Sequence, residues 1–172
     1  REFRPVTPGR VSMYVCGVTP YDVTHLGHAF SYVQFDTLRR YLASLGYAVT
    51  YVQNVTDIDD DMIMVSKRQG GRPIPEIRAE NDAIFRRDLD RLNVLRPSAY
   101  PFATDHIPEI IETTRILIER GHAYAVDGDV FFEASTFPGY GKLNGVTLDE
   151  LAGRENPESK RAYKKRGPLD FL

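Results

Sequence analysis

The chain has 172 residues, a formal net charge of −2 and 27% charged residues, which is the composition of an ordinary globular protein and excludes a strong overall attraction to nucleic acid. No apolar run approaches the length of a membrane span, and residues 1–8 lack an apolar signal core, so we expect neither a membrane segment nor a secretory signal. The single cysteine excludes an intrachain disulfide, and a reducing cytoplasm is the expected location.

The first third of the chain predicts a βαβ unit. Residues 11–16 are short and apolar and predict a buried strand, and residues 25–45 carry apolar side chains at helical spacing. Gly46 follows the helix where a left-handed cap is expected. Residues 48–55 are rich in β-branched and aromatic side chains and predict a second strand. Two strands joined by a helix are expected to be parallel, with a right-handed crossover.

The rest of the chain predicts mainly helices and one hairpin. Helical patterns cover residues 57–67, 76–93 and 107–120, and prolines and glycines break the chain at 70–75 and 97–101. Residues 122–126 and 130–133 flank Asp127-Gly128, a hairpin signal. Residues 155–166 are polar and charged. The apolar residues 169–172 have nothing after them to pack on, so we expect the natural chain to continue.

The sequence His25-Leu26-Gly27-His28 opens the predicted crossover helix. A helix start after the first strand of a parallel sheet is an anion site, because free N–H groups and the positive end of the macrodipole point there. Gly27 would let a purine or phosphate approach the backbone. The two imidazoles share one face and could donate hydrogen bonds to phosphate oxygens. The alternative is that both histidines cap the helix or are solvated, and spacing alone does not separate these interpretations.

Several blocks of the chain resemble the cysteine-specific branch of the class I aminoacyl-tRNA synthetases. In chain order they are MYVCG at 13–17, TPYD at 19–22, HLGHA at 25–29, VQNVTDIDD at 52–60, TDHIPEII at 104–111, YGKL at 140–143 and PLDF at 168–171. The resemblance implies an α/β fold with the Rossmann-like parallel nucleotide-binding sheet of that class, incomplete here, with a helical segment and a hairpin. It also implies that residues 1–172 are the N-terminal part of a catalytic domain, with 57–172 as a mostly helical extension and insertion.

The activity that the resemblance implies is activation of L-cysteine by ATP, with Mg²⁺, to cysteinyl-adenylate, followed by transfer to tRNA(Cys). His25 and His28 would be the catalytic residues. The implied nucleotide and adenylate site comprises Cys16, Gly17, Val18, Thr19, Tyr21, His25, Gly27, His28, Ser31, Asn54, Val55 and Thr56. The position of Asn54 to Thr56 at the end of the second predicted strand supports their place in this site, since ligands of such sheets bind at the carboxyl ends of the strands. The alternative for Asn54 and Thr56 is capping of the next helix.

Cys16 would by resemblance ligate one Zn²⁺ that selects the thiolate of substrate cysteine over the hydroxyl of serine, a distinction that ordinary pocket contacts make poorly. The alternative is a small buried side chain. The family's remaining zinc ligands and its Lys-Met-Ser-Lys-Ser loop are absent from this chain. We therefore expect these residues alone to be inactive and to hold zinc weakly.

The resemblance has departures that leave the acceptor open. Val18 stands where synthetases usually carry proline, and the string TPYDVTHLGH at 19–28 looks more like the cysteine ligase of the mycothiol pathway, which joins cysteine to an amino sugar. Phe30 and Asp61 also replace the usual arginine and lysine. A third hypothesis is a truncated, non-catalytic relative that binds nucleotide or RNA.

Two charged clusters have a functional and a simpler interpretation. The acidic cluster could suggest a metal, but the dipole of a helix start also favours such residues; it comprises Asp57, Asp59, Asp60 and Asp61. The basic run could meet an RNA acceptor stem or could be a solvated loop; it comprises Lys160, Arg161, Lys164, Lys165 and Arg166.

Overall fold

A computed structural model of the chain describes residues 2–143, 145, 147, 150 and 164–172. The chain forms two compact units, the first ending at His106 and the second beginning at Ile107. The first unit carries every residue of the predicted site. In the described part of the chain, no helix combines the length and apolar character needed to cross a membrane.

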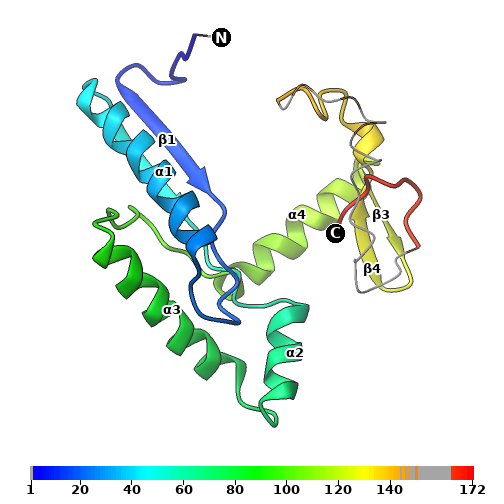
Figure 1. The fold of residues 1–172 in the computed structure, drawn as a ribbon. Helices are drawn as coiled ribbons and strands as arrows, with labels where there is room; N and C mark the ends of the chain where they lie inside the picture. The colour runs from blue at the N-terminus through cyan, green and yellow to red at the C-terminus, as the bar shows by residue number, and fades with distance from the viewer. Residues whose placement is uncertain (1, 144, 146, 148–149, 151–163) are drawn as a thin grey trace. The chain divides into compact units, whose positions relative to one another are not determined.

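The first unit contains a parallel βαβ motif, whose first strand and helix are labelled in Figure 1. Strands β1 (Arg10–Val15) and β2 (Ala48–Gln53) pair in parallel from Arg10↔Ala48 to Val15↔Gln53. Helix α1 (Leu26–Ser44) connects them. The predicted parallel pairing is confirmed, and both strands end at the same edge of the sheet.

A third parallel segment, which the sequence analysis did not predict, lies beside β2. Bridges join Val52 to Ala99 and Val55 to Phe102, and the Val55 N–H donates to the Pro101 carbonyl at 2.9 Å. The segment was predicted as a break because it contains proline, which cannot donate a hydrogen bond to a ladder. Proline is tolerated here because its carbonyl still accepts from the neighbouring strand.

Two helices join β2 to this third segment. Helix α2 (Asp60–Arg68) starts at the cap residue Asp59, whose side chain accepts from the Met62 N–H at 2.9 Å, and α3 is Ile74–Arg91. The helices predicted over 57–67 and 76–93 are therefore confirmed with shifted ends. Only part of the acidic cluster lies in the first turn of α2, because Asp57 precedes the helix.

The apolar core of the first unit lies between α1, α3 and the sheet. Its buried members are Val15, Val18, Tyr32, Tyr51, Phe85 and Leu89. The ring of Tyr32 on α1 meets that of Phe85 on α3 edge to face, with centroids 5.2 Å apart. Burying each large apolar side chain contributes roughly 1.5–3 kcal/mol, so this cluster fixes α1 against the carboxyl end of β1.

The second unit contains a helix and a hairpin. Helix α4 is Ile107–Glu119, and β3 (Ala123–Val126) pairs antiparallel with β4 (Asp129–Phe132). Both turn residues between the strands have positive φ, 52° at Asp127 and 90° at Gly128, as the sequence signal predicts. Phe171 bridges Phe132, so the apolar C-terminal residues do find a partner within the chain.

Each unit also contains a short 3₁₀ turn among its described residues, Ala103–His106 at the end of the first unit and Ala134–Thr136 in the second. Of the predicted basic run, Lys160 and Arg161 lie outside the described residues. Lys164 pairs with Asp127, and Arg166 lies 3.6 Å from Glu133.

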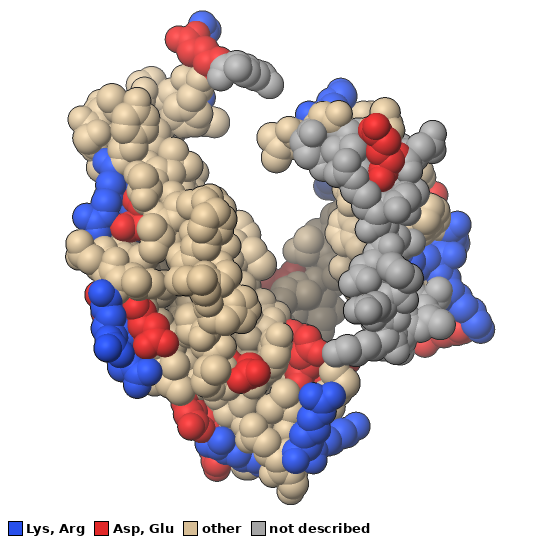
Figure 2. Space-filling model, in the orientation of Figure 1, with Lys and Arg blue, Asp and Glu red and all other residues tan. Residues whose placement is uncertain are grey.

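Charged side chains are mixed in sign over the face of the molecule that Figure 2 shows. Lys and Arg are interspersed with Asp and Glu along the edges of the first unit, and uncharged side chains cover much of the rest. This agrees with the small net charge and gives this face no extended field of one sign.

The side chain of Asp57, which follows β2, forms hydrogen bonds with α3 and with the segment that contains Thr104. Its carboxylate, 1% exposed, accepts hydrogen bonds from the N–H and hydroxyl of Thr104, at 3.0 and 2.6 Å, and from the Arg78 guanidinium at 3.1 Å. Burial acts to raise the pKa of Asp57, but the hydrogen bonds from Thr104 and Arg78 outweigh it and hold the pKa below its usual value.

We expect Asp57→Ala to reduce the free energy of unfolding at pH 7 by about 2–3 kcal/mol, because it leaves buried donors without an acceptor. The folded pKa lies below the unfolded one, so this stabilisation is present above the unfolded pKa and is lost as the pH falls through the folded pKa. The difference between the wild-type protein and the variant should shrink below about pH 4. Urea denaturation across pH measures it; Glu112→Ala, in an exposed ion pair, is the control. A difference that stays constant down to pH 2 would contradict the assignment.

Candidate functional site

The two histidines at the start of α1 form a reciprocal capping box. His25 is the cap residue, with extended backbone (φ −124°, ψ 171°), and its Nδ1 accepts from the Gly27 N–H at 3.1 Å. The Nδ1 of His28 accepts from the His25 N–H at 3.4 Å. The two rings stack, with centroids 3.7 Å apart. The capping interpretation of these histidines is therefore correct, and it fixes how both rings are held.

This cap also determines which ring nitrogen can donate. A neutral imidazole that accepts through Nδ1 carries its proton on Nε2, so each ring presents an Nε2–H donor away from the helix backbone. Burial lowers the pKa of His28, and the neighbouring His25 lowers it further. His28 is thus a neutral donor at pH 7. Helix capping and donation to a ligand use different atoms of the same ring and are compatible.

Gly17, just beyond β1, lies directly against the backbone that follows β2. A Cβ atom at this position would lie 1.5 Å from the Asn54 carbonyl oxygen, so only glycine fits. The Asn54 side-chain oxygen accepts from the Gly17 N–H at 2.7 Å and from the Tyr14 hydroxyl at 3.0 Å. The Asn54 amide donates to the Thr56 hydroxyl at 3.3 Å.

These contacts correct one interpretation of the sequence. Asn54 and Thr56 were given helix capping as an alternative role, but Asp59 caps α2. The Asn54 side chain instead holds the end of β1, and the Thr56 N–H donates to the Val18 carbonyl at 3.1 Å.

A cleft of about 490 Å³ opens beside these strand ends. Its lining includes seven of the predicted site residues, namely Cys16, Gly17, Val18, Thr19, Tyr21, His28 and Ser31. His25, Gly27, Asn54 and Thr56 lie next to these residues through the hydrogen bonds described above. Val55 differs, because it is fully buried, its N–H donates to the Pro101 carbonyl, and its carbonyl accepts from the Ala103 N–H. Its contribution is to hold the sheet edge.

Three aromatic residues of the cleft were not among the predicted site residues: Tyr14, Tyr32 and Phe35. Tyr32 is 5% exposed, and its hydroxyl donates to the Cys16 carbonyl at 3.0 Å. Helical spacing was the available signal, since His28, Tyr32 and Phe35 fall on one face of α1. The sequence analysis used helical spacing only to predict the helix and did not single out Tyr32.

Cys16 is an exposed thiol at the cleft rim, which corrects the alternative that it is a small buried side chain. Within the residues that the structure describes, no three His, Cys, Asp or Glu side chains gather into a possible metal site. The described part of the chain therefore supplies Cys16 without the set of neighbouring donors that a zinc ion needs, and it does not by itself fit a zinc ion.

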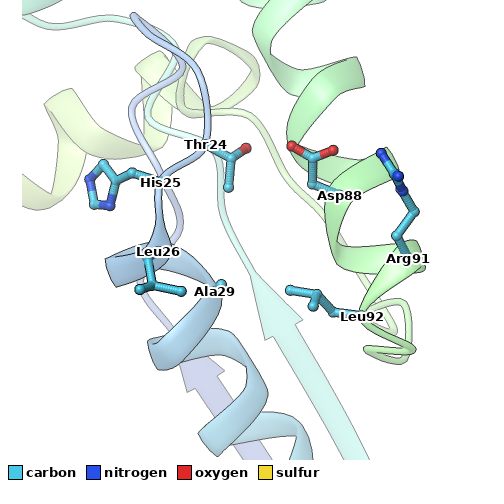
Figure 3. A pocket seen from close by; sticks show the side chains of 7 residues that line it. All are labelled: Thr24, His25, Leu26, Ala29, Asp88, Arg91 and Leu92. Carbon is cyan, nitrogen blue, oxygen red and sulfur yellow. The ribbon is translucent and has the colours of Figure 1, made fainter.

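A second cavity, of about 320 Å³, lies on another side of the helix start (Figure 3). Leu26 and Ala29 of α1 face Leu92 across it, with Thr24, Asp88 and Arg91 around it. The ring of His25 points away from this cavity. Seven of the predicted site residues line the larger cleft, whereas His25 is the only predicted site residue in the lining of the smaller cavity.

Comparison with known proteins identifies the family. The profile described as tRNA synthetases class I (C) catalytic domain matches residues 2–172. This chain belongs to that family. This chain is 48% identical over 170 residues to a cysteine–tRNA ligase of Cyanothece sp. and 49% identical to one of Trichlorobacter lovleyi. Both alignments cover 98% of this chain and 34% of the relative.

Plant and structural relatives agree with the family assignment. This chain is 46% identical to an Arabidopsis thaliana cysteine–tRNA ligase named chloroplastic/mitochondrial, over 98% of this chain and 30% of the relative. A solved structure from Campylobacter jejuni that carries the name arginyl tRNA synthetase matches 77% of this chain and 39% of its own, with a TM-score of 0.55 and 16% identity, which supports the fold. The chain thus spans about a third of the length of its curated relatives.

We expect Gly17→Ala to reduce the free energy of unfolding of this chain by more than about 3 kcal/mol, because the new methyl group meets a backbone oxygen that cannot move without separating β1 from β2. Gly139→Ala is the matched control, since its nearest side-chain neighbour would be at an ordinary 3.4 Å. Thermal and urea denaturation of both variants measures the difference. Equal stability of the two variants would show that the strand ends are not held as closely as described.

Proposed function

We propose that this chain is the N-terminal part of the catalytic nucleotide-binding domain of a cysteine–tRNA ligase. The full enzyme would activate L-cysteine with ATP and transfer it to tRNA(Cys). The observation that carries the proposal is the cleft at the strand ends, which brings the exposed Cys16 and the neutral donor His28 to one place. The names of the relatives supply the amino acid and the acceptor.

The proposed reaction forms a bond between the cysteine carboxylate and the α-phosphorus of ATP and releases pyrophosphate. A carboxylate is already ionised at neutral pH, so the step needs no general base. His25 and His28 would act by donating Nε2–H hydrogen bonds to phosphate oxygens as charge develops on them. Mg²⁺ would accompany ATP and reduce the charge on its phosphates.

The acceptor follows from the relatives and not from the cleft. The relatives described above are cysteine–tRNA ligases, which favours tRNA over the amino sugar of the mycothiol-type ligase. Both acceptors follow the same activation step, so they are distinguished only after the adenylate has formed. A non-catalytic relative would bind nucleotide without either reaction.

The test of this function is ATP–pyrophosphate exchange by the full-length enzyme that carries this chain. Exchange should depend on L-cysteine and should be much weaker with L-serine. Subsequent transfer to tRNA(Cys), but not to a glucosaminyl-inositol, should follow. An exchange rate that does not depend on added L-cysteine would refute the proposal, and transfer to the amino sugar would favour the mycothiol-type alternative.

The same exchange assay can test the role of the histidines, because the capping box assigns different roles to their two ring nitrogens. Asparagine at position 25 or 28 can replace the Nδ1 acceptor but does not reach as far as Nε2, whereas glutamine reaches the Nε2 position. We expect His28→Gln to retain more exchange activity than His28→Asn, and alanine to retain least, with losses of about 10²–10³-fold in kcat and small effects on ATP binding. Equal activity of all three variants, or losses confined to ATP binding, would contradict the donor role.

We also propose that Cys16 is one ligand of a Zn²⁺ ion in the full-length enzyme, with the other ligands outside this chain. When bound, the metal would favour a thiolate over a hydroxyl and so select cysteine. A reducing compartment such as the cytoplasm would keep the Cys16 thiol available for this role.

The isolated 172-residue chain should lose any added zinc to a chelator, because its described residues include no group of three donors that could hold a metal. In the full-length enzyme, Cys16→Ser should reduce bound zinc and raise the KM for cysteine while the KM for ATP changes little. Metal analysis after dialysis against a chelator measures the first effect. Stoichiometric, chelator-resistant zinc in the isolated chain would refute the proposed division of ligands.

A further inference from the structure

The peptide bond between Cys16 and Gly17 is held from both sides by side chains. The paired register of the two strands ends at Val15↔Gln53, so Cys16 lies one residue beyond it. The carbonyl of Cys16 accepts from the Tyr32 hydroxyl at 3.0 Å, and the N–H of Gly17 donates to the Asn54 side chain at 2.7 Å. Both groups belong to the same planar peptide unit.

Two anchors on one peptide plane restrict its rotation. Since the plane begins at the Cα atom of Cys16, fixing it limits the backbone torsions that set the direction of the Cys16 side chain. One anchor, Tyr32, comes from α1 and is four residues after His28 on the same helical face. The Tyr32 hydroxyl therefore links the helix that carries the histidine donor to the strand end that carries the thiol.

The packing of Tyr32 does not require its hydroxyl group. The ring fills the core against Phe85, which a phenylalanine at position 32 would do equally well. Tyr51 provides a comparison within the same core, because its hydroxyl is also buried but donates to Gln53, at 3.1 Å, and Tyr51 does not line the cleft. The two tyrosines differ in what their hydroxyl groups hold.

We propose that Tyr32 is a positioning residue for the cysteine-binding side of the cleft, acting through the Cys16–Gly17 peptide together with Asn54. This inference rests on the proposed function in so far as Cys16 contributes to the recognition of substrate cysteine. Without the Tyr32 hydroxyl, the Cys16 carbonyl loses its partner and the peptide plane is held at the Gly17 end alone. The thiol of Cys16 then samples directions that do not face the substrate.

The first test compares Tyr32→Phe with Tyr51→Phe in the full-length enzyme. Each variant removes one buried hydroxyl and keeps its ring, so both should lower Tm to a similar extent. Only Tyr32→Phe should raise the KM for cysteine, by about fivefold, with the KM for ATP within about twofold of wild type, since one neutral hydrogen bond is lost. Equal cysteine KM values for the two variants, or a matching rise in the ATP KM, would overturn the proposal.

The second test needs no activity and uses this chain itself. Hydrogen exchange of the Gly17 amide, followed by NMR, should be about fivefold faster in Tyr32→Phe than in Tyr51→Phe, because one end of the peptide is released. Asn54→Ala, which removes the acceptor of that N–H, is the positive control. Unchanged Gly17 exchange in Tyr32→Phe would overturn the proposal. Faster exchange in an enzyme that does not activate cysteine would support the anchoring and refute the proposed function.

Discussion

The close approach of the Gly17 backbone to the Asn54 carbonyl is the contact on which the candidate site depends. Parallel pairing of β1 and β2 ends both strands at one edge of the sheet, but pairing alone leaves room for a side chain between the segments that follow. The missing Cβ of Gly17 removes that space, and the Asn54 side chain then reaches the Gly17 N–H. The cleft forms where these two chain segments meet, at the position where sheets of this kind bind ligands.

The start of α1 shows how one side chain serves both stability and chemistry. A histidine cap uses Nδ1 for the helix backbone and leaves Nε2 for a ligand, whereas serine or aspartate in the same place would satisfy the backbone and offer no comparable donor. Stacking of the two rings keeps both donors on one side of the helix start. The requirement for two histidines at this spacing is therefore geometric as well as chemical.

The sequence predicted the parts of this structure that have a regular pattern. Helical spacing placed α1 and α3, and β-branched and aromatic residues placed β2, so the parallel βαβ unit could be predicted. The third strand segment could not, because Pro97 and Pro101 suppress the strand signal although a carbonyl contact suffices there. Family resemblance named most cleft residues, but it did not distinguish Val55, which is buried, from neighbours that reach the cleft.

Side-chain roles were harder to predict than positions, because they depend on partners distant in sequence. Asn54 looks like a helix cap when only its neighbours are read, and its true partners are 37 and 40 positions away. Tyr32 was not singled out by the helical spacing, and its hydroxyl meets a carbonyl 16 positions earlier.

These separations also set the order in which the site can assemble as the chain is made. Tyr32 can reach Cys16 as soon as the first turns of α1 exist, whereas the Gly17 N–H waits for Asn54 and therefore for the whole crossover and the second strand. Such long-range parallel pairings are slow steps, since loop closure comes before any contact compensates for it. A nascent chain that ends within α1 therefore carries the thiol, both histidines and the residues that line the cleft, but it lacks the Asn54 side chain that holds the Gly17 N–H in the folded protein.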